Sequence, residues 1–388
     1  MNKEKKIKII ISIVAISFIQ GLQYSVSPVL GQIQSYYAGV DISLVQMLVT
    51  APALLAMIVA LVSGWLVLKI SKKKLLVFGC LVAGIAGFLP FLSDSFELLF
   101  FSRTFYGVGL GLACALNTAV VAEFFEGDER VTVMGIQASS IGAGMVVIST
   151  LGGKLGAYGF RASYFINIVG FLSMVVIALL LPDTGKARVS GKDKIRLNKK
   201  VFAVSFIGIV EVLFLMSYTT NIAMHISGKL AGDTMVSGIL TGVFAAAQIV
   251  MGLLLGRVTK IFGNYSLPAA MLSFCAGAVI VMCFPSSYLG LIIGAVFCGF
   301  SQGMFVPQAM CEVSNAVKPV AAAMAAAIFT CALCIGQLLS PIVLNAASKL
   351  FFGNVTTTYV FLIAAIGMGI AGILVSIRQF AQGSAMRT

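Results

Sequence analysis

Twelve apolar stretches, each about long enough to cross a membrane as a helix, dominate this chain of 388 residues. A spanning helix needs roughly 20 predominantly apolar residues. Only 10% of the residues are charged, whereas about 25% is usual in a soluble domain. The sequence therefore predicts an all-α polytopic membrane protein. The predicted spans are 8–30, 44–67, 75–93, 96–121, 131–151, 162–181, 202–226, 236–256, 265–284, 288–310, 321–347 and 357–377.

Lysine and arginine are distributed unevenly between alternate loops. With the N-terminus inside, 21 of the 26 fall in predicted inner segments and four in outer loops. Because positively charged loops stay on the cytoplasmic face, we expect a multi-pass cell-membrane protein with both termini cytoplasmic. The net charge of +13 then reflects this topology and an attraction to anionic membrane lipid. The charges form no single basic domain, so nucleic acid is not an expected partner.

A short basic turn, 64–76, joins the second and third apolar stretches. It begins at Gly64 and carries Lys69, Lys72, Lys73 and Lys74. Lysine is almost never buried without a partner in a soluble core, and between two hydrophobic helices it is typical of a cytoplasmic loop.

A constant offset relates the two halves of the chain. Gly64 and Gly256 both begin basic turns and are 192 residues apart. One ungapped offset that relates several such pairs indicates a duplicated chain. We therefore expect two six-helix bundles, 1–181 and 201–388, joined by a basic cytoplasmic linker, 182–200. The other pairs at this offset are Asp41 with Asp233, Gly107 with Gly299, and Gly111 with Gly303.

The two basic turns resemble the loop between helices two and three of the major facilitator superfamily, G-x-L-x-D-R-x-G-R-R. Leu68 and Lys260 stand at the acidic position of that pattern. The resemblance implies twelve helices in two pseudo-symmetric halves, a secondary transporter that works by alternating access, and a gate motif on the cytoplasmic side. The residues assigned to this motif are Gly64, Lys69, Lys72, Lys73, Gly256 and Gly263.

Arg103 is the only lysine or arginine deep within a predicted span. Arg103 followed by Gly107 resembles the helix-four motif of the superfamily, which implies a role in proton coupling or in binding an anionic solute. A charge at mid-membrane costs roughly 3 kcal/mol or more, which favours a functional role. The alternative is an arginine that pairs with a carboxylate only to hold the bundle together.

Glu211 is the only acidic residue that we place in mid-span. In the superfamily, helices one, four, seven and ten surround the central cavity, so the resemblance implies that Arg103 and Glu211 face each other or share a solute. Burial and a nearby arginine have opposite effects on the proton affinity of a carboxyl group, and a group balanced in this way can carry a proton. A permanent pair between Arg103 and Glu211 is the alternative.

Further polar residues share helix faces in the first, fourth, seventh and tenth spans. Because a polar face turned to lipid is costly, we expect these residues to line a cavity, and the alternative is hydrogen bonding between helices. The candidates are Gln20, Gln23, Tyr24, Tyr106, Asn117, Tyr218, Asn221 and Gln302.

No catalytic or metal-ligating cluster is evident in the sequence. The single histidine, His225, cannot build a metal site unaided, and the eight cysteines fall in apolar stretches. We find no ATP-binding motif, so no cofactor is expected and a proton or other ion gradient is the expected driving force. The chain is not expected to be an enzyme.

The best functional hypothesis is a proton-coupled exporter of small organic compounds, either drug-like or metabolites, that works as a monomer. The family's antiporters carry Gly-Pro on helix five where this chain has Ile148 and Ser149. An uptake symporter for an organic anion is therefore the alternative. A non-transporting membrane sensor on the same fold is a second alternative.

Overall fold

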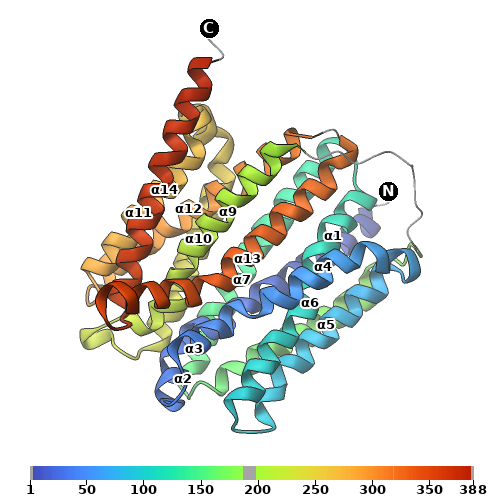
Figure 1. Cartoon of the computed structure of the whole chain (residues 1–388). Helices are drawn as coiled ribbons and strands as arrows, with labels where there is room; N and C mark the ends of the chain where they lie inside the picture. The colour runs from blue at the N-terminus through green and yellow to red at the C-terminus, as the bar shows by residue number, and fades with distance from the viewer. Residues whose placement is uncertain (1–2, 187–197, 318, 386–388) are drawn as a thin grey trace. The chain divides into compact units, whose positions relative to one another are not determined.

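The computed structural model of the chain describes residues 3–186, 198–317 and 319–385 (Figure 1). Within these residues, twelve helical segments are long and apolar enough to cross a membrane. Each predicted span overlaps one of these helical segments. Several of the segments are longer than the predicted span by a turn or more. The predicted all-α architecture with twelve spans is therefore confirmed.

The chain divides into two compact units, residues 1–193 and 194–388. Much of the predicted linker, residues 187–197, lies outside the described residues. The helices of the first unit are α1 (Lys3–Gly21), η1 (Leu22–Val29), α2 (Leu30–Tyr36), α3 (Ile42–Thr50), α4 (Pro52–Lys69), α5 (Lys72–Phe88), η2 (Leu89–Phe91), α6 (Phe96–Phe124), α7 (Gly127–Gly156), η3 (Ala162–Asn167) and α8 (Ile168–Leu180). Those of the second are α9 (Lys199–His225), η4 (Gly228–Leu230), α10 (Thr234–Phe262), η5 (Gly263–Tyr265), α11 (Ser266–Cys283), α12 (Tyr288–Asn315), α13 (Pro319–Phe352) and α14 (Thr357–Ala385).

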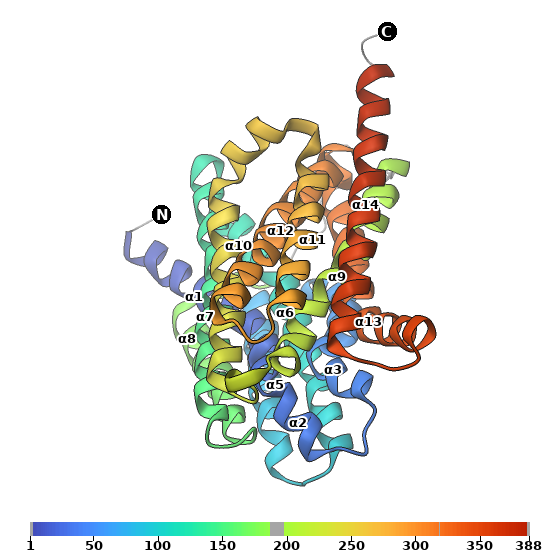
Figure 2. The same cartoon turned by 90° about the vertical axis from the view of Figure 1, so that its left-hand side faces the viewer.

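The two units repeat the same packing scheme. In the first unit α6 packs against both α4 and α5, while α1 packs against α7 and α8. In the second unit α12 packs against both α10 and α11, while α9 packs against α13 and α14. Figures 1 and 2 both show α11 and α14 running side by side. The duplication read from the sequence is thus a duplication of helix packing.

Equivalent glycines make close helix contacts in both units. A Cβ atom on Gly107 would lie 2.2 Å from the carbonyl oxygen of Pro52, and one on Gly299 would lie 2.2 Å from that of Phe244. Pro52 and Phe244 are themselves 192 residues apart, so glycine permits the same backbone approach twice. The second contact of this kind pairs Gly111 with Ala56 and Gly303 with Gln248.

Equivalent aspartates begin the second span of each unit. The Asp41 carboxylate accepts a hydrogen bond from the amide of Ser43 at 2.7 Å. The Asp233 carboxylate accepts one from the amide of Met235 at 2.8 Å. Both are N-cap interactions, which satisfy amides that a helix leaves without partners.

Gly107→Ala and Gly299→Ala should each destabilise the protein. The new methyl group would overlap a backbone carbonyl, and overpacking of this kind costs about 1–3 kcal/mol. Gly252→Ala is the matched control, because a Cβ atom at Gly252 in α10 has no neighbour within 4 Å. Melting temperatures of the purified variants in detergent would measure the effect. Equal temperatures for all three would contradict the packing argument.

Candidate functional site

Arg103 is buried in the first unit, with 3% of its surface exposed. Its Nε donates to the carbonyl oxygen of Leu48 at 3.0 Å, and its Nη2 donates to that of Gln23 at 2.6 Å. The guanidinium lies 5.2 Å from the centre of the Tyr106 ring. The side chain therefore joins α6 to the first and second spans.

The sequence explains why these carbonyls are available. Pro52 has no amide hydrogen, so the carbonyl of Leu48, four residues earlier, lacks its helical donor. Gln23 lies in η1, a 3-10 segment that interrupts the α-helical hydrogen-bonding pattern between α1 and α2. The side chain of Gln23 also links η1 to α3, because its Nε2 donates to the carbonyl of Val49 at 3.2 Å. Arg103 thus supplies donors where two spanning helices are irregular.

No ion pair within the described part of the first unit includes Arg103. The ion pairs there are formed by other residues, and the charge of Arg103 is solvated by carbonyl dipoles. Arg103 and Glu211 lie in different units. That they face each other or share a solute stays a prediction.

Tyr106 and Asn117 connect α6 to α1. Tyr106 is 1% exposed, and its hydroxyl donates to the carbonyl of Ile19. Asn117 is fully buried, and its Nδ2 donates to the hydroxyl of Ser17 at 2.9 Å. Both side chains therefore make the interhelical bonds that we weighed as the alternative to lining a cavity.

The remaining candidates of the first span are half-buried. Tyr24 and Gln20 each keep part of their surface exposed. The Nε2 of Gln20 has no hydrogen-bond partner within the described residues, so it is a donor that a solute could use.

Glu211 is fully buried in α9 of the second unit. Neither carboxylate oxygen has a hydrogen-bond partner among the described residues. One turn earlier, a Cβ atom on Gly208 would lie 2.8 Å from Phe329 and 3.0 Å from Leu333 of α13, so this stretch of α9 packs on apolar side chains. An ionised carboxylate without a partner is costly in such surroundings, which makes Glu211 chemically suited to holding a proton.

Two further candidates on α9 are buried and hydrogen-bonded. The Tyr218 hydroxyl donates to the carbonyl of Leu240 at 3.1 Å, and its ring stacks on Phe244. Asn221 donates to the carbonyl of Ser217 at 3.0 Å. These contacts fix both side chains in the second unit.

His225 joins three helices at the C-terminal end of α9. Its Nε2 lies 3.1 Å from the carbonyl of Val281, and its Nδ1 lies 2.9 Å from the hydroxyl of Thr357. Because a carbonyl only accepts, Nε2 carries the hydrogen and Nδ1 accepts from Thr357. His225 is therefore held as a packing residue.

Buried polar atoms without partners accumulate on three helices of the second unit. Among the described residues of these helices, the sequence analysis selected two that carry such atoms. They are Glu211 on α9 and Gln302, through its Oε1 atom, on α12. These helices, α9, α12 and α13, pack against one another. The atoms that the sequence analysis missed include Ser205 Oγ, Ser217 Oγ, Ser301 Oγ, Gln337 Nε2 and Ser340 Oγ.

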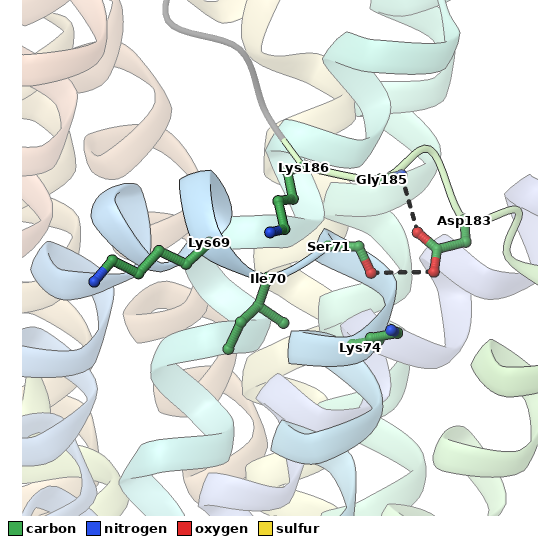
Figure 3. A pocket seen from close by; sticks show the side chains of 7 residues that line it. All are labelled: Lys69, Ile70, Ser71, Lys74, Asp183, Gly185 and Lys186. Carbon is green, nitrogen blue, oxygen red and sulfur yellow. Dashed lines mark hydrogen bonds between the residues drawn. The ribbon is translucent and has the colours of Figure 1, made fainter.

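The basic turn of the first unit has acidic partners from other elements. Lys72 forms an ion pair with Glu123 of α6 at 2.8 Å. The hydroxyl of Ser71 donates to the carboxylate of Asp183 at 3.1 Å, after the end of α8 (Figure 3). Glu123 and Asp183 thus bring acidic groups to this turn, in which Leu68 stands at the acidic position of the motif.

The predicted turns are shorter than expected, because Gly64 lies inside α4 and Gly256 inside α10. A Cβ atom on Gly64 or Gly256 would meet nothing within 4 Å. Gly263 ends α10 with φ of +52°, a conformation that favours glycine.

The repeated packing of twelve membrane-length helices and the buried ionisable residues define a polytopic membrane protein of duplicated design. A family model described as "Major Facilitator Superfamily" matches residues 12–215 and 204–381. The chain belongs to the major facilitator superfamily, and it is a transporter of that family.

Two bacterial relatives illustrate the similarity. "Quinolone resistance protein NorA" of Staphylococcus aureus (strain MSSA476) is 25% identical over 270 residues, which are 66% of this chain and 69% of the relative. "Multidrug resistance protein 1" of Bacillus subtilis (strain 168) is 24% identical over 261 residues, which are 64% of this chain and 67% of the relative.

Solved structures support the fold alone. The nucleoside transporter NupG (D323A mutant) has a TM-score of 0.78 at 14% identity, covering 96% of this chain and 100% of that chain. The POT family transporter PepTSo has a TM-score of 0.79 at 9% identity, covering 98% of this chain and 99% of that chain.

Proposed function

We propose that this transporter exports small organic compounds, including drug-like cations, in exchange for protons. The observation that carries the proposal is the complete burial of Glu211 without a partner for either oxygen among the described residues. The printed names of the two bacterial relatives, which refer to quinolone and multidrug resistance, support the substrate class.

The physical basis is a carboxyl group whose protonation differs between two states. Enclosed as it is here, Glu211 is stable as the neutral acid, because an unpaired buried charge is costly. In a state that opens to water it can release the proton and accept a cation. A group that binds protons differently in two states shifts their populations, and this couples alternating access to the proton gradient.

The surroundings of Arg103 lend less support to the alternative of anion uptake. Two of its donors already bind the backbone carbonyls of Gln23 and Leu48. We therefore assign Arg103 a positioning role in the first unit. The partnerless atoms on α9, α12 and α13, among the described residues, give the second unit a set of polar groups that a solute can use.

The remaining parts of the proposal follow from the sequence. We place the protein in the cell membrane with both termini cytoplasmic, because 21 lysines and arginines fall in the predicted inner segments. It works as a monomer, uses a proton gradient in place of a cofactor, and carries out no catalysis.

The test is flux across proteoliposomes with an acidic lumen and a neutral exterior. We expect a fluorescent lipophilic cation, and a quinolone, to accumulate inside while a trapped pH dye reports proton release. Accumulation of organic anions when the gradient is reversed, with a neutral lumen and an acidic exterior, would replace the proposal with the symporter. Binding of the cation without any flux would replace it with the sensor.

A further inference from the structure

A cavity of about 410 Å³ lies at one end of the first unit, next to the basic turn. Its walls come from the end of α4, the start of α5 and the segment after α8 (Figure 3). The lysine distribution predicts that this end is cytoplasmic. The residues that line the cavity are Lys69, Ile70, Ser71, Lys74, Asp183, Gly185 and Lys186.

The cavity wall carries an excess of positive charge. Three of its side chains are lysines and one is an aspartate. The first turn of α5 adds Lys73 to the excess, at the helix end where the backbone dipole is already positive, whereas Lys72 is paired with Glu123. Ser71 precedes this turn without capping it through its side chain.

Asp183 is hydrogen-bonded on both oxygens and offsets only part of this excess. Its Oδ1 accepts from the amide of Gly185 at 3.0 Å, and its Oδ2 accepts from the hydroxyl of Ser71 at 3.1 Å. The Gly185 amide holds the pKa of the carboxyl group below its ordinary value, and Ser71 and the nearby lysines act in the same direction. The ionised aspartate therefore offsets one lysine and leaves the rest.

Figure 3 shows how the three lysines of the wall lie. Lys186 reaches down toward Ile70 and Ser71, and Lys74 lies beneath Asp183, whereas Lys69 turns away from both. The Lys69 ammonium lies 3.9 Å from the centre of the Trp65 ring. Lys74 and Lys186 are thus the cations available to a ligand in the cavity.

Trp65 indicates the depth of the cavity in the membrane. It is the single tryptophan of the chain, it is 54% exposed, and it precedes Lys69 by one turn of α4. Tryptophan favours the level of the lipid headgroups, and lysine next to it extends toward water. Leu61, one turn deeper on α4, is 56% exposed and suits contact with acyl chains. The cavity therefore lies where a lipid headgroup would be.

We infer that this cavity binds a phosphate-bearing anion, supplied by the headgroup of an anionic phospholipid. Clusters of lysine just beyond a membrane helix attract such lipids. Here the cluster surrounds a defined hollow, with apolar helix surface beneath it for the acyl chains.

The test uses Trp65 as its own probe. We would reconstitute the protein in phosphatidylcholine bilayers that contain increasing fractions of phosphatidylglycerol with brominated chains, and measure quenching of Trp65 fluorescence. Brominated phosphatidylcholine gives the baseline. We expect selective quenching by phosphatidylglycerol, and an affinity about 25-fold lower in the Lys74→Gln, Lys186→Gln double variant, since each lysine near an anionic surface contributes about fivefold.

The matched control is the double variant Lys199→Gln, Lys260→Gln, which removes the same charge from exposed positions outside the cavity. It should keep the selectivity, and both variants keep the Trp65–Lys69 contact. Equal loss in both variants, or equal quenching by the two lipids, would overturn the proposal.

Asp183→Asn provides a test of opposite sign. Its amide keeps one oxygen that accepts from Gly185, and its NH2 group can donate to the hydroxyl oxygen of Ser71. The substitution removes the only negative charge of the lining, so phosphatidylglycerol should bind about fivefold more tightly. Inorganic phosphate at constant ionic strength should not relieve the quenching. Relief at millimolar phosphate would assign the cavity to free phosphate and would overturn the lipid as its source.

Discussion

Glu211→Gln should abolish proton-driven transport and leave the protein at least as stable as the original. Glutamine has the same shape but binds no proton, so the differential protonation that biases the two states is lost. We expect uptake driven by a pH gradient in proteoliposomes to fall by about tenfold or more. The melting temperature should not fall, because the substitution removes a buried acid with no partner among the described residues.

Glu312→Gln is the control for this prediction. Glu312 also lies in the second unit, near the C-terminal end of α12, where it forms a partly exposed ion pair with Lys200 at 3.7 Å. Surface pairs of this kind contribute about 0–1 kcal/mol, so coupling should persist. Proton-driven uptake that is unchanged in Glu211→Gln would remove the proposed role of Glu211.

Arg103→Met should destabilise the first unit strongly. Two hydrogen bonds from a charged group are lost and two buried carbonyls lose their donor, so we expect about 3 kcal/mol or more. Arg161→Met is the control, because Arg161 forms an exposed pair with Asp94 and should change stability by about 1 kcal/mol or less. Thermal unfolding in detergent would measure both.

The double variant with Pro52→Ala tests the mechanism behind the Arg103 contact. Alanine at this position regains an amide that can donate to the carbonyl of Leu48. The cost of Arg103→Met should therefore be smaller in the Pro52→Ala background, by about 1 kcal/mol. Strictly additive effects would show that the Leu48 carbonyl does not depend on Arg103.

Hydropathy and a constant offset were sufficient to predict the spans and the duplication. Each span needs only a run of apolar residues, which is a local property of the sequence. The offset of 192 succeeded because close helix contacts require glycine at equivalent positions in both halves, as at Gly107 and Gly299. These features depend on residue type, so a single sequence carries them.

The partners of the candidate residues could be predicted only in part. Pro52 marks Leu48 as a carbonyl without a donor, but nothing local indicates that Arg103, 55 residues away, supplies one. Leu68 stands where the motif of the superfamily has an acidic residue. Nothing local in the sequence indicates that Asp183, after the end of the sixth span, accepts a hydrogen bond from Ser71 of the same turn. Such contacts depend on how distant helices pack.

The unused polar atoms of α12 and α13 illustrate the same limit. Ser301 and Ser340 look like ordinary helix residues in the sequence. Their lack of a partner within the described residues emerges only when three helices are packed together.

The duplicated helices differ in stiffness. In the first unit the second span consists of α3 and α4, and Pro52 interrupts its hydrogen bonds; in the second unit α10 is a single helix from Thr234 to Phe262 with Phe244 at the equivalent position. Bending of the second span will therefore concentrate at the junction of α3 and α4 in the first unit, while the equivalent α10 is one continuous helix. The second span of the duplicated unit is therefore jointed in the first copy and continuous in the second.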